Sequence, residues 1–205
     1  ACKKHDASLI HISTDYVFDG IAKKPYKVNA ITNPVNVYGK SKLAGEVELR
    51  KHDINFIILR TSWVFSEYGN NFVKTMLNLA KSNNSLSIVS DQVGSPTYAG
   101  DIAKGLIVLS SKFKNDNTKD IYHISGGPSC SWHEFAKTIL RISYAKGFTK
   151  NMPKLIPILS KDYDDIVNRP AFTSLDCNKY FDEFKISPYR WEDSLYHVIK
   201  NSKIL

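Results

Sequence analysis

The chain has 205 residues, of which 42% are hydrophobic and 12% aromatic, so it can form one large domain or two small ones around a substantial core. Its longest apolar runs, such as GLIVL and NFIIL, are far shorter than the roughly 20 residues that span a bilayer, and its first residues lack the apolar run of a signal peptide. The formal charge of +8 is scattered along the chain, which argues against a nucleic-acid-binding protein and equally suits attraction of a small anionic ligand. We therefore expect a cytoplasmic protein with no membrane segment and no nucleic-acid partner.

Hydrophobic pattern and turn residues predict strands that alternate with helices. The expected strands are residues 8–13, 55–60, 86–89 and 121–124. The expected helices are residues 36–52, 70–81, 98–113, 132–146 and 191–201. Ser131 and Glu134 have the spacing of a capping box, which supports the start of the helix at residue 132. The alternation of strands and helices along the chain is typical of βαβ units and predicts an α/β fold with a largely parallel sheet.

Two parts of the expected fold are weak or missing in the sequence. Prolines and aspartates interrupt any period between residues 150 and 188, and this part of the chain is expected to be less regular. The ten glycines form no G-x-G-x-x-G array, although a doubly wound sheet normally carries its phosphate-binding glycines after the first strand. The first predicted strand leads instead into TDYVFDG. We therefore interpret the chain as the C-terminal portion of a doubly wound parallel-sheet protein.

Neither the cysteines nor the histidines are arranged as a metal site. Cys2, Cys130 and Cys177 are far apart and form no C-x-x-C, and the six histidines stand singly. An odd number of widely separated cysteines argues against a disulfide framework, and zinc ligands usually come in closely spaced pairs. Reduced thiols and no metal are the expectation.

Candidate reactive groups follow the first predicted strand. Thr14 and Asp15 come at its carboxyl end, where open α/β sheets bind their ligands. Tyr38 and Lys42 then lie four residues apart, on one face of the next helix. The same spacing occurs at Tyr196 and Lys200 in the last helix, so the spacing alone decides nothing.

The surrounding sequence distinguishes the two pairs. The stretches ISTDYVFDG, NVYGKSKLAGE, LRTSWVFSEYGNNFVKTML and DQVGSPTYAGDIA, in this order, resemble the dTDP-4-dehydrorhamnose reductase family of the extended short-chain dehydrogenase/reductase superfamily. NRPAFTSLD, around Arg169, is also similar to the C-terminal part of that family. The resemblance implies a Rossmann-like fold and reduction of the C4 ketone of a dTDP-sugar with NADPH or NADH. It also implies a role in polysaccharide biosynthesis and leaves a homodimer possible.

The chemistry of ketone reduction assigns roles to the three reactive groups. Carbon receives a hydride and oxygen a proton, and tyrosine, with a pKa near 10, is too weak an acid unless a cation favours its ionised form. Tyr38 is the expected proton donor and Lys42 its electrostatic partner. Thr14 is expected to bind the substrate oxygen. The resemblance further implies that Tyr38 and Lys42 contact the nicotinamide nucleotide.

The remaining expected site residues bind the sugar nucleotide. They are Asp15 at the strand end, Trp63 in TSW, Asn71 in GNNF and Arg169, which could pair with a diphosphate. Trp63 could equally fill core space, and Asn71 could simply cap a helix. Residues 91–97 are expected to form a tight loop beside the same cleft.

The resemblance also suggests a division of the chain. Residues 1–62 are expected to be the remaining part of a dinucleotide-binding domain, and residues 63–205 mainly a substrate-binding region with some elements returning to the sheet. Several βα units of roughly 30 residues each are expected ahead of Ala1, so this chain alone is expected to bind no NAD(P)H and to be inactive. A non-catalytic, reductase-like binding or regulatory subunit is the alternative, although such a subunit would not need all of Thr14, Tyr38 and Lys42.

Overall fold

The computed structural model describes residues 1–114, 117–163 and 167–202. Its strands are β1 Leu9–Thr14, β2 Phe56–Thr61, β3 Val64–Phe65, β4 Ser85–Val89, β5 Val93–Gly94, β6 Thr97–Tyr98, β7 Lys119–His123, β8 Cys130–Ser131 and β9 Lys154–Ile158. Its α-helices are α1 Val37–Arg50, α2 Phe72–Ser82, α3 Ala99–Ser110, α4 Trp132–Ala145, α5 Asn178–Phe184 and α6 Trp191–Asn201. Short 3-10 helices are η1 Cys2–His5, η2 Asp15–Val17, η3 Ser111–Lys114 and η4 Ser160–Asp162.

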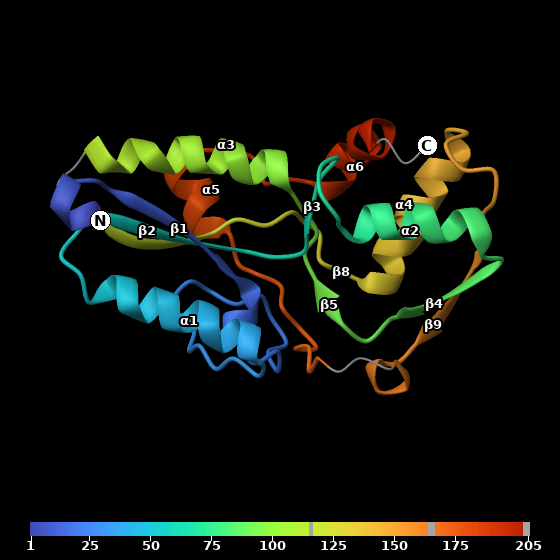
Figure 1. The fold of residues 1–205 in the computed structure, drawn as a ribbon, viewed down its shortest axis with the longest axis horizontal. Coiled ribbons are helices and arrows are strands. Elements are labelled where there is room, and N and C mark those ends of the chain that lie inside the picture. Colours follow the sequence, from blue (N-terminus) through green and yellow to red (C-terminus); the bar gives the residue numbers. More distant parts are fainter. Residues whose placement is uncertain (115–116, 164–166, 203–205) are drawn as a thin grey trace.

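A parallel sheet in the order β1-β2-β7 forms one half of the molecule. The central strand β2 is buried along its whole length, and its side chains alternate between two helix layers. Ile57 and Leu59 pack with residues of α3 and α5, whereas Phe56 and Ile58 pack against Leu49 of α1. Figure 1 shows α1 on one side of this sheet and α3 on the other. The predicted α/β fold with helices on both faces of a parallel sheet is confirmed.

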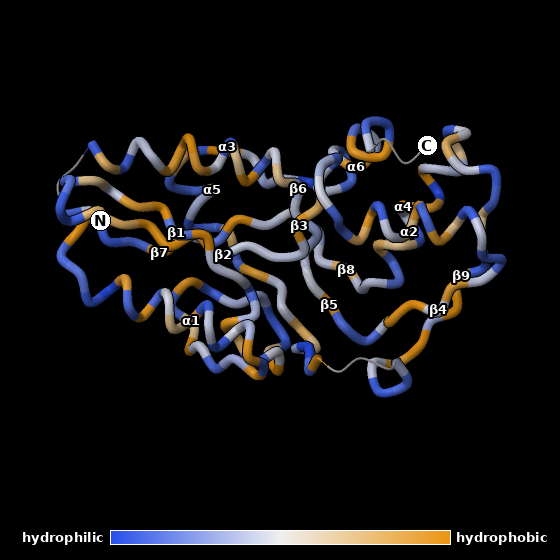
Figure 2. The backbone as a smooth tube through the Cα atoms, in the orientation of Figure 1, coloured by the Kyte–Doolittle hydropathy of each residue, from blue (hydrophilic) through white to orange (hydrophobic). Residues whose placement is uncertain are grey.

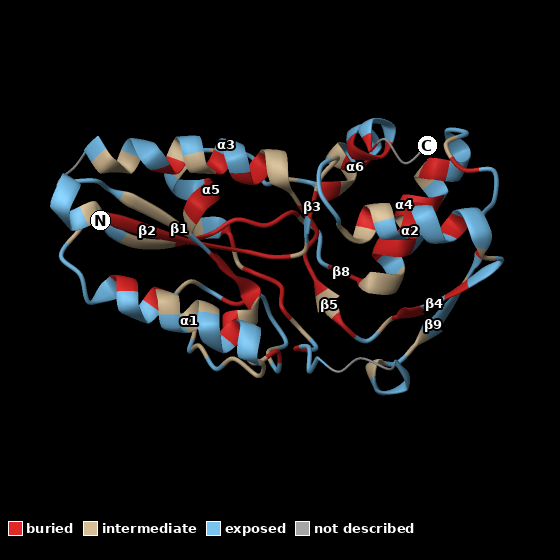
Figure 3. Ribbon diagram, viewed as in Figure 1, coloured by how far each residue is buried: buried red, intermediate tan, exposed pale blue. Residues whose placement is uncertain are grey.

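The other half contains α2, α4 and α6 together with the two-stranded parallel sheet β4-β9 (Figure 1). Helix α2 buries Val73, Met76, Leu77 and Ala80, which lie at i, i+3, i+4 and i+7. This spacing places all four on one face, where they join a core that includes residues of α4 and α6. Figure 3 shows buried segments along both α2 and α4.

Two segments differ from the sequence predictions. Residues 150–188, which we expected to be less regular, contain the regular elements β9 and α5. Pro157 of β9 pairs with Ile88 of β4 in a two-stranded sheet, where a strand edge tolerates a missing N–H. Residues 91–97, predicted as a loop, include β5 and the first residue of β6, which pair with β8 and β3. These short strands depend on partners that are distant in sequence, so no local pattern marks them.

One edge of the larger sheet is open. Among the described residues, β1 pairs only with β2, and Ile12 of β1 is 44% exposed. Figure 2 shows that the strands of this sheet are among the most hydrophobic parts of the backbone. The division at residue 62 stays a prediction; β7, from the second range, shares a sheet with β1 and β2, in line with the expectation that some elements return to the sheet.

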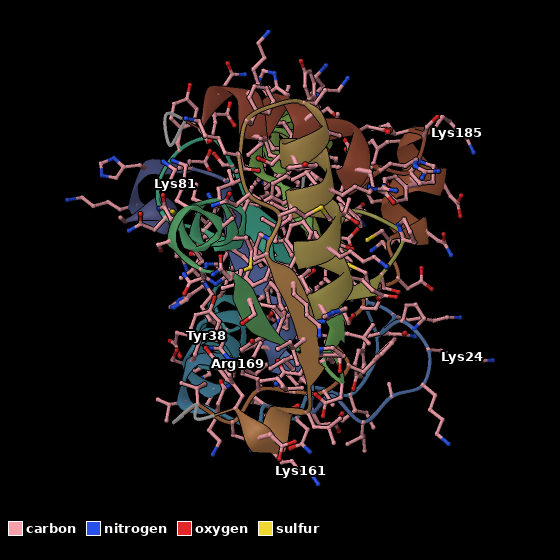
Figure 4. The ribbon with its side chains drawn as sticks, turned by 90° about the vertical axis from the view of Figure 1, so that its right-hand side faces the viewer. Lys24, Tyr38, Lys81, Lys161, Arg169 and Lys185 are labelled. Carbon is pink, nitrogen blue, oxygen red and sulfur yellow. The ribbon has the colours of Figure 1, made fainter. Side chains whose placement is uncertain are left out.

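Apart from the buried Arg60, many basic side chains lie on the outside of the molecule. In Figure 4, Lys24 and Lys185 lie on one side of the molecule, Lys81 on the opposite side and Lys161 at the lower end. Within the three described ranges, no helix combines the length and the apolar character needed to cross a membrane.

Candidate active site

Thr14 is held firmly at the carboxyl end of β1. Its side chain is buried, its Oγ1 donates a hydrogen bond to Asp15 Oδ1 (3.0 Å), and the same oxygen accepts the N–H of Tyr16 (3.2 Å). The second bond caps η2, which begins at Asp15. The predicted substrate-oxygen ligand is thus fixed at a strand end, where α/β sheets bind ligands.

Asp15 is a buried carboxylate next to this hydroxyl. Its Oδ2 is buried and faces the buried hydroxyl of Thr173. Burial raises the pKa of Asp15 to about 7, and the hydroxyls of Thr173 and Thr14 oppose this rise. A carboxyl group in this state can exchange a proton near neutral pH.

The start of α1 brings Tyr38 close to this strand end. The Asn36 side chain accepts the N–H of Gly39 (2.8 Å) and so caps the helix. A Cβ at Gly39 would lie 2.1 Å from the carbonyl oxygen of Tyr16, so only glycine permits this close approach. As a result the rings of Tyr38 and Tyr16 meet edge to face, with 5.8 Å between their centroids.

Tyr38 and Lys42 lie one turn apart on α1, next to β1. Tyr38 is 54% exposed and so is accessible to a ligand. The Nζ of Lys42 donates a hydrogen bond to the carbonyl oxygen of Ile12 in β1 (2.6 Å). Among the predicted site residues, the fold therefore brings Thr14, Asp15, Tyr38 and Lys42 to one end of β1.

A buried ion pair fixes α1 against the sheet. Glu46 of α1 and Arg60 of β2 are 0% and 1% exposed, and their two hydrogen bonds measure 2.9 and 2.7 Å. The Ser13 hydroxyl, beside Thr14, also donates to Glu46 Oε1 (2.6 Å). Burial alone would raise the pKa of Glu46, but the hydrogen bonds and charge of Arg60 and the Ser13 bond outweigh it and hold the pKa below its ordinary value.

A cavity of about 670 Å³ lies among α2, β4, α4 and residues of the segments 160–163 and 167–169. One group of lining residues is mostly apolar or aromatic: Phe72, Met76, Leu79, Ile88, Val89 and Trp132. A second group is polar or basic: Thr75, Ser87, Gln92, Ser160, Lys161, Tyr163, Asn168 and Arg169. A cavity of this size with an apolar, aromatic wall and convergent polar groups suits a small-molecule ligand.

The cavity adjoins the Tyr38 site through Asn168 and Arg169. The backbone oxygen of Asn168 accepts a hydrogen bond from Asn36 Nδ2 (2.9 Å), and the Arg169 guanidinium donates to the Tyr16 hydroxyl (3.3 Å). Tyr16 in turn contacts Tyr38. Figure 4 shows Arg169 and Tyr38 close together. The predicted anion ligand Arg169 thus lies between the cavity and the predicted proton donor.

Trp63 and Asn71 do not line this cavity. The Trp63 indole is stacked on Trp132, with 3.4 Å between ring centroids and 3° between ring planes. The Asn71 side chain caps α2 by accepting the Lys74 N–H (3.3 Å), and its Nδ2 donates to the Ser66 carbonyl (2.7 Å). Substrate binding by these two residues stays a prediction.

Sequence reasoning missed Tyr16, Trp132 and Lys161. Tyr16 directly follows the Thr14–Asp15 pair, and this position could have marked it. Trp132 was recognised only as the first residue of a helix, and Lys161 lies in a segment without a local pattern. In the part of the chain that the structure describes, no cluster of three histidine, cysteine, aspartate or glutamate residues could hold a metal ion.

Comparison with known proteins gives consistent results. The family described as the RmlD substrate binding domain matches residues 1–204. The chain is 44% identical over 200 residues to a dTDP-4-dehydrorhamnose reductase from Aggregatibacter actinomycetemcomitans, covering 97% of this chain and 68% of the relative. A crystal structure of dTDP-4-dehydrorhamnose reductase from Bacillus anthracis in complex with NADP superposes with a TM-score of 0.83 at 32% identity, covering 98% of this chain and 68% of that one.

A second solved structure, a dTDP-4-dehydrorhamnose reductase from Clostridium acetobutylicum, has a TM-score of 0.86 at 33% identity, with 97% of this chain and 67% of that chain covered. Another relative, from Sinorhizobium fredii, is covered over 65% of its length. The chain therefore spans about two thirds of the length of the proteins that it matches.

Proposed function

Since this chain belongs to the family of the RmlD substrate binding domain and of the dTDP-4-dehydrorhamnose reductases, we propose that it forms the substrate-binding and proton-donating part of such a reductase. The substrate is the C4 ketone of dTDP-4-dehydro-L-rhamnose, the product is dTDP-L-rhamnose, and the reductant is NADPH or NADH.

The observation that carries this proposal is the connection between the Tyr38 site and the cavity. Lys42 is hydrogen-bonded to Ile12 of β1, Tyr38 contacts Tyr16, which lies two residues after Thr14, and Arg169 links this end of β1 to the cavity through Tyr16. The cavity combines an aromatic wall for a base with Lys161 and Arg169 for phosphates. A nucleoside diphosphate bound there would place its sugar toward Tyr38.

The residues of this chain account for the proton in the reaction. As hydride reaches the carbonyl carbon, Tyr38 donates its phenolic proton to the carbonyl oxygen, and the product is an alcohol. The ammonium of Lys42 lowers the energy of the phenolate that remains. Thr14 would donate its hydroxyl proton to the same substrate oxygen, in exchange for the hydrogen bond that it makes to Asp15 without a ligand.

The nicotinamide nucleotide supplies the hydride when it is bound. The chemistry of this chain fits the ribose end of that cofactor, because Lys42 presents an ammonium and Tyr38 an exposed hydroxyl on one helix face. The 205 residues contain no glycine-rich loop for the pyrophosphate. We infer that such a loop comes from outside this chain, and that the chain by itself turns over no keto sugar.

Replacement of Tyr38 by Phe tests the proposal. In the full-length reductase, Tyr38→Phe should lower kcat by about 100- to 10,000-fold with little change in KM, because only the acidic proton is removed. The matched control is Tyr196→Phe in α6, which removes a hydroxyl from a tyrosine with the same i+4 lysine. Near-normal turnover by the Tyr38 variant would contradict the proposal. Binding of the dTDP-sugar by the wild-type protein without any turnover would favour a non-catalytic binding subunit instead.

A further inference from the structure

Trp132 occupies an unusual position between the core and the cavity. It is the first residue of α4, is half-buried, and lines the cavity together with Phe72 of α2. The Phe72 ring lies 4.6 Å from the Trp132 ring and is tilted by 47°. The two rings therefore form a continuous aromatic wall at one side of the cavity.

Trp63 supports this wall from the other side. Its ring covers Trp132 at 3.4 Å and nearly parallel. Gly94 of β5 leaves room for the Trp63 indole, because a Cβ there would lie 2.3 Å from Trp63 Cε2. Trp63 also has a left-handed backbone with φ of 43°, which is uncommon for a bulky residue. These constraints fix Trp63 beneath Trp132 and so restrict the rotation of Trp132.

The polar side of the cavity is also held in place. Asp91 Oδ1 accepts two hydrogen bonds from Ser160, one from the backbone N–H (2.8 Å) and one from the hydroxyl (2.5 Å). This fixes the backbone next to Lys161, and Arg169 lines the same cavity. An aromatic wall and two cations in one cavity suit a ligand with a flat ring and a polyphosphate group.

We propose that Trp132 is the platform on which the base of the nucleotide sugar stacks, with Phe72 beside it and Trp63 as its structural support. The identity of the nucleotide rests on the proposed function. Stacking of a base on an aromatic side chain is sequence-tolerant and depends on a rigid, accessible ring. Trp63 and Trp132 each cover one face of the other, but of the two it is Trp132 that lines the cavity and is accessible from it. Trp132 therefore determines affinity for the nucleoside part of the substrate and leaves the chemical step unchanged.

Calorimetric titration of the full-length protein with dTDP tests this assignment. Loss of base stacking costs about 1 to 3 kcal/mol, so Trp132→Ala should raise the Kd for dTDP by roughly 5- to 150-fold. Trp132→Phe, which keeps an aromatic ring, should raise it less. The control is Tyr144→Ala, which removes an exposed aromatic ring from the same helix and should leave the Kd unchanged.

A second probe separates stacking from a general disturbance of the cavity. Inorganic pyrophosphate has no base, so its Kd should be the same for the wild type and for Trp132→Ala. The KM of the dTDP-sugar should rise in parallel with the Kd for dTDP, at nearly constant kcat. An unchanged Kd for dTDP in a folded Trp132→Ala protein, or an equal weakening of dTDP and pyrophosphate, would overturn the assignment. Failure of the wild-type protein to bind dTDP would instead overturn the proposed function on which it rests.

Discussion

The buried pair of Glu46 and Arg60 allows a quantitative test of how the catalytic helix is held. We consider Glu46→Gln, which keeps the shape of the side chain and removes its charge. In the native structure one carboxylate accepts two hydrogen bonds from Arg60, one from Ser13 and one from Arg50. An amide would turn one acceptor into a donor that faces these donors, and Arg60 would keep a buried charge without its counterion.

The expected loss of unfolding free energy follows from the removal of the carboxylate that pairs with Arg60. Removal of one member of a buried ion pair typically destabilises a protein by about 3 to 5 kcal/mol. The Gln carbonyl can still accept one of the bonds, so we expect the lower end, about 3 kcal/mol. At about 2 to 4 °C per kcal/mol for a chain of this size, Tm should fall by roughly 6 to 12 °C. The change would remove a large share of a total stability of about 5 to 15 kcal/mol.

The loss of stability caused by Glu46→Gln should depend on pH and should become smaller as the pH falls. The folded state lowers the pKa of Glu46 below its ordinary value of 4.5, so the unfolded chain binds the proton more readily. The stabilisation by the carboxylate is therefore present above pH 4.5 and is lost as the pH falls through the folded pKa. The difference between wild type and Glu46→Gln should be largest at neutral pH and should shrink on acidification.

Urea unfolding at pH 7 and at pH 4, followed by circular dichroism, measures this difference. The control is Glu48→Gln, the same chemical change two residues away on α1, where the carboxylate pairs with Lys51 and His52 at the surface. Surface pairs contribute little, so this variant should match the wild type. Equal stability of the two variants at pH 7, or a Glu46 effect that grows on acidification, would refute the reasoning.

Two further predictions concern the walls of the site. Gly94→Ala should destabilise the protein by about 1 to 3 kcal/mol in urea unfolding, because the new Cβ would overlap the Trp63 side chain. The control is Gly45→Ala, where the nearest neighbour of the new Cβ would be His11 Nε2 at 3.5 Å, and this variant should not lose stability. Equal effects of the two substitutions would contradict the packing argument. The raised pKa of Asp15 means that its ionisation destabilises the folded state, so the wild-type protein should lose stability relative to Asp15→Asn as the pH rises from about 4 to about 7. Parallel stability curves for the two proteins over this range would show that Asp15 is not a buried carboxyl group of raised pKa.

The sequence by itself determined the elements that have a strong local pattern. Helix α2 was predicted because its buried residues repeat with helical spacing, and the start of α4 because Ser131 and Glu134 form a capping box, which the structure contains. The strands β1, β2 and β7 were predicted because each is a short apolar run between turn residues. The positions of Thr14, Tyr38 and Lys42 were selected from the sequence around them, and their roles stay predictions.

Only the tertiary structure decided which distant residues meet. The strands β5, β6 and β8 have two residues each, and they exist because partner strands hydrogen-bond to them. The approach of Tyr38 to Tyr16 depends on Gly39, and the contact of Arg169 with Tyr16 joins residues 153 positions apart in the chain. Sequence patterns report the preference of each segment for a helix or strand and the face that it buries. They do not report which buried faces pack together, because that choice depends on the shapes and charges of segments far apart in the sequence.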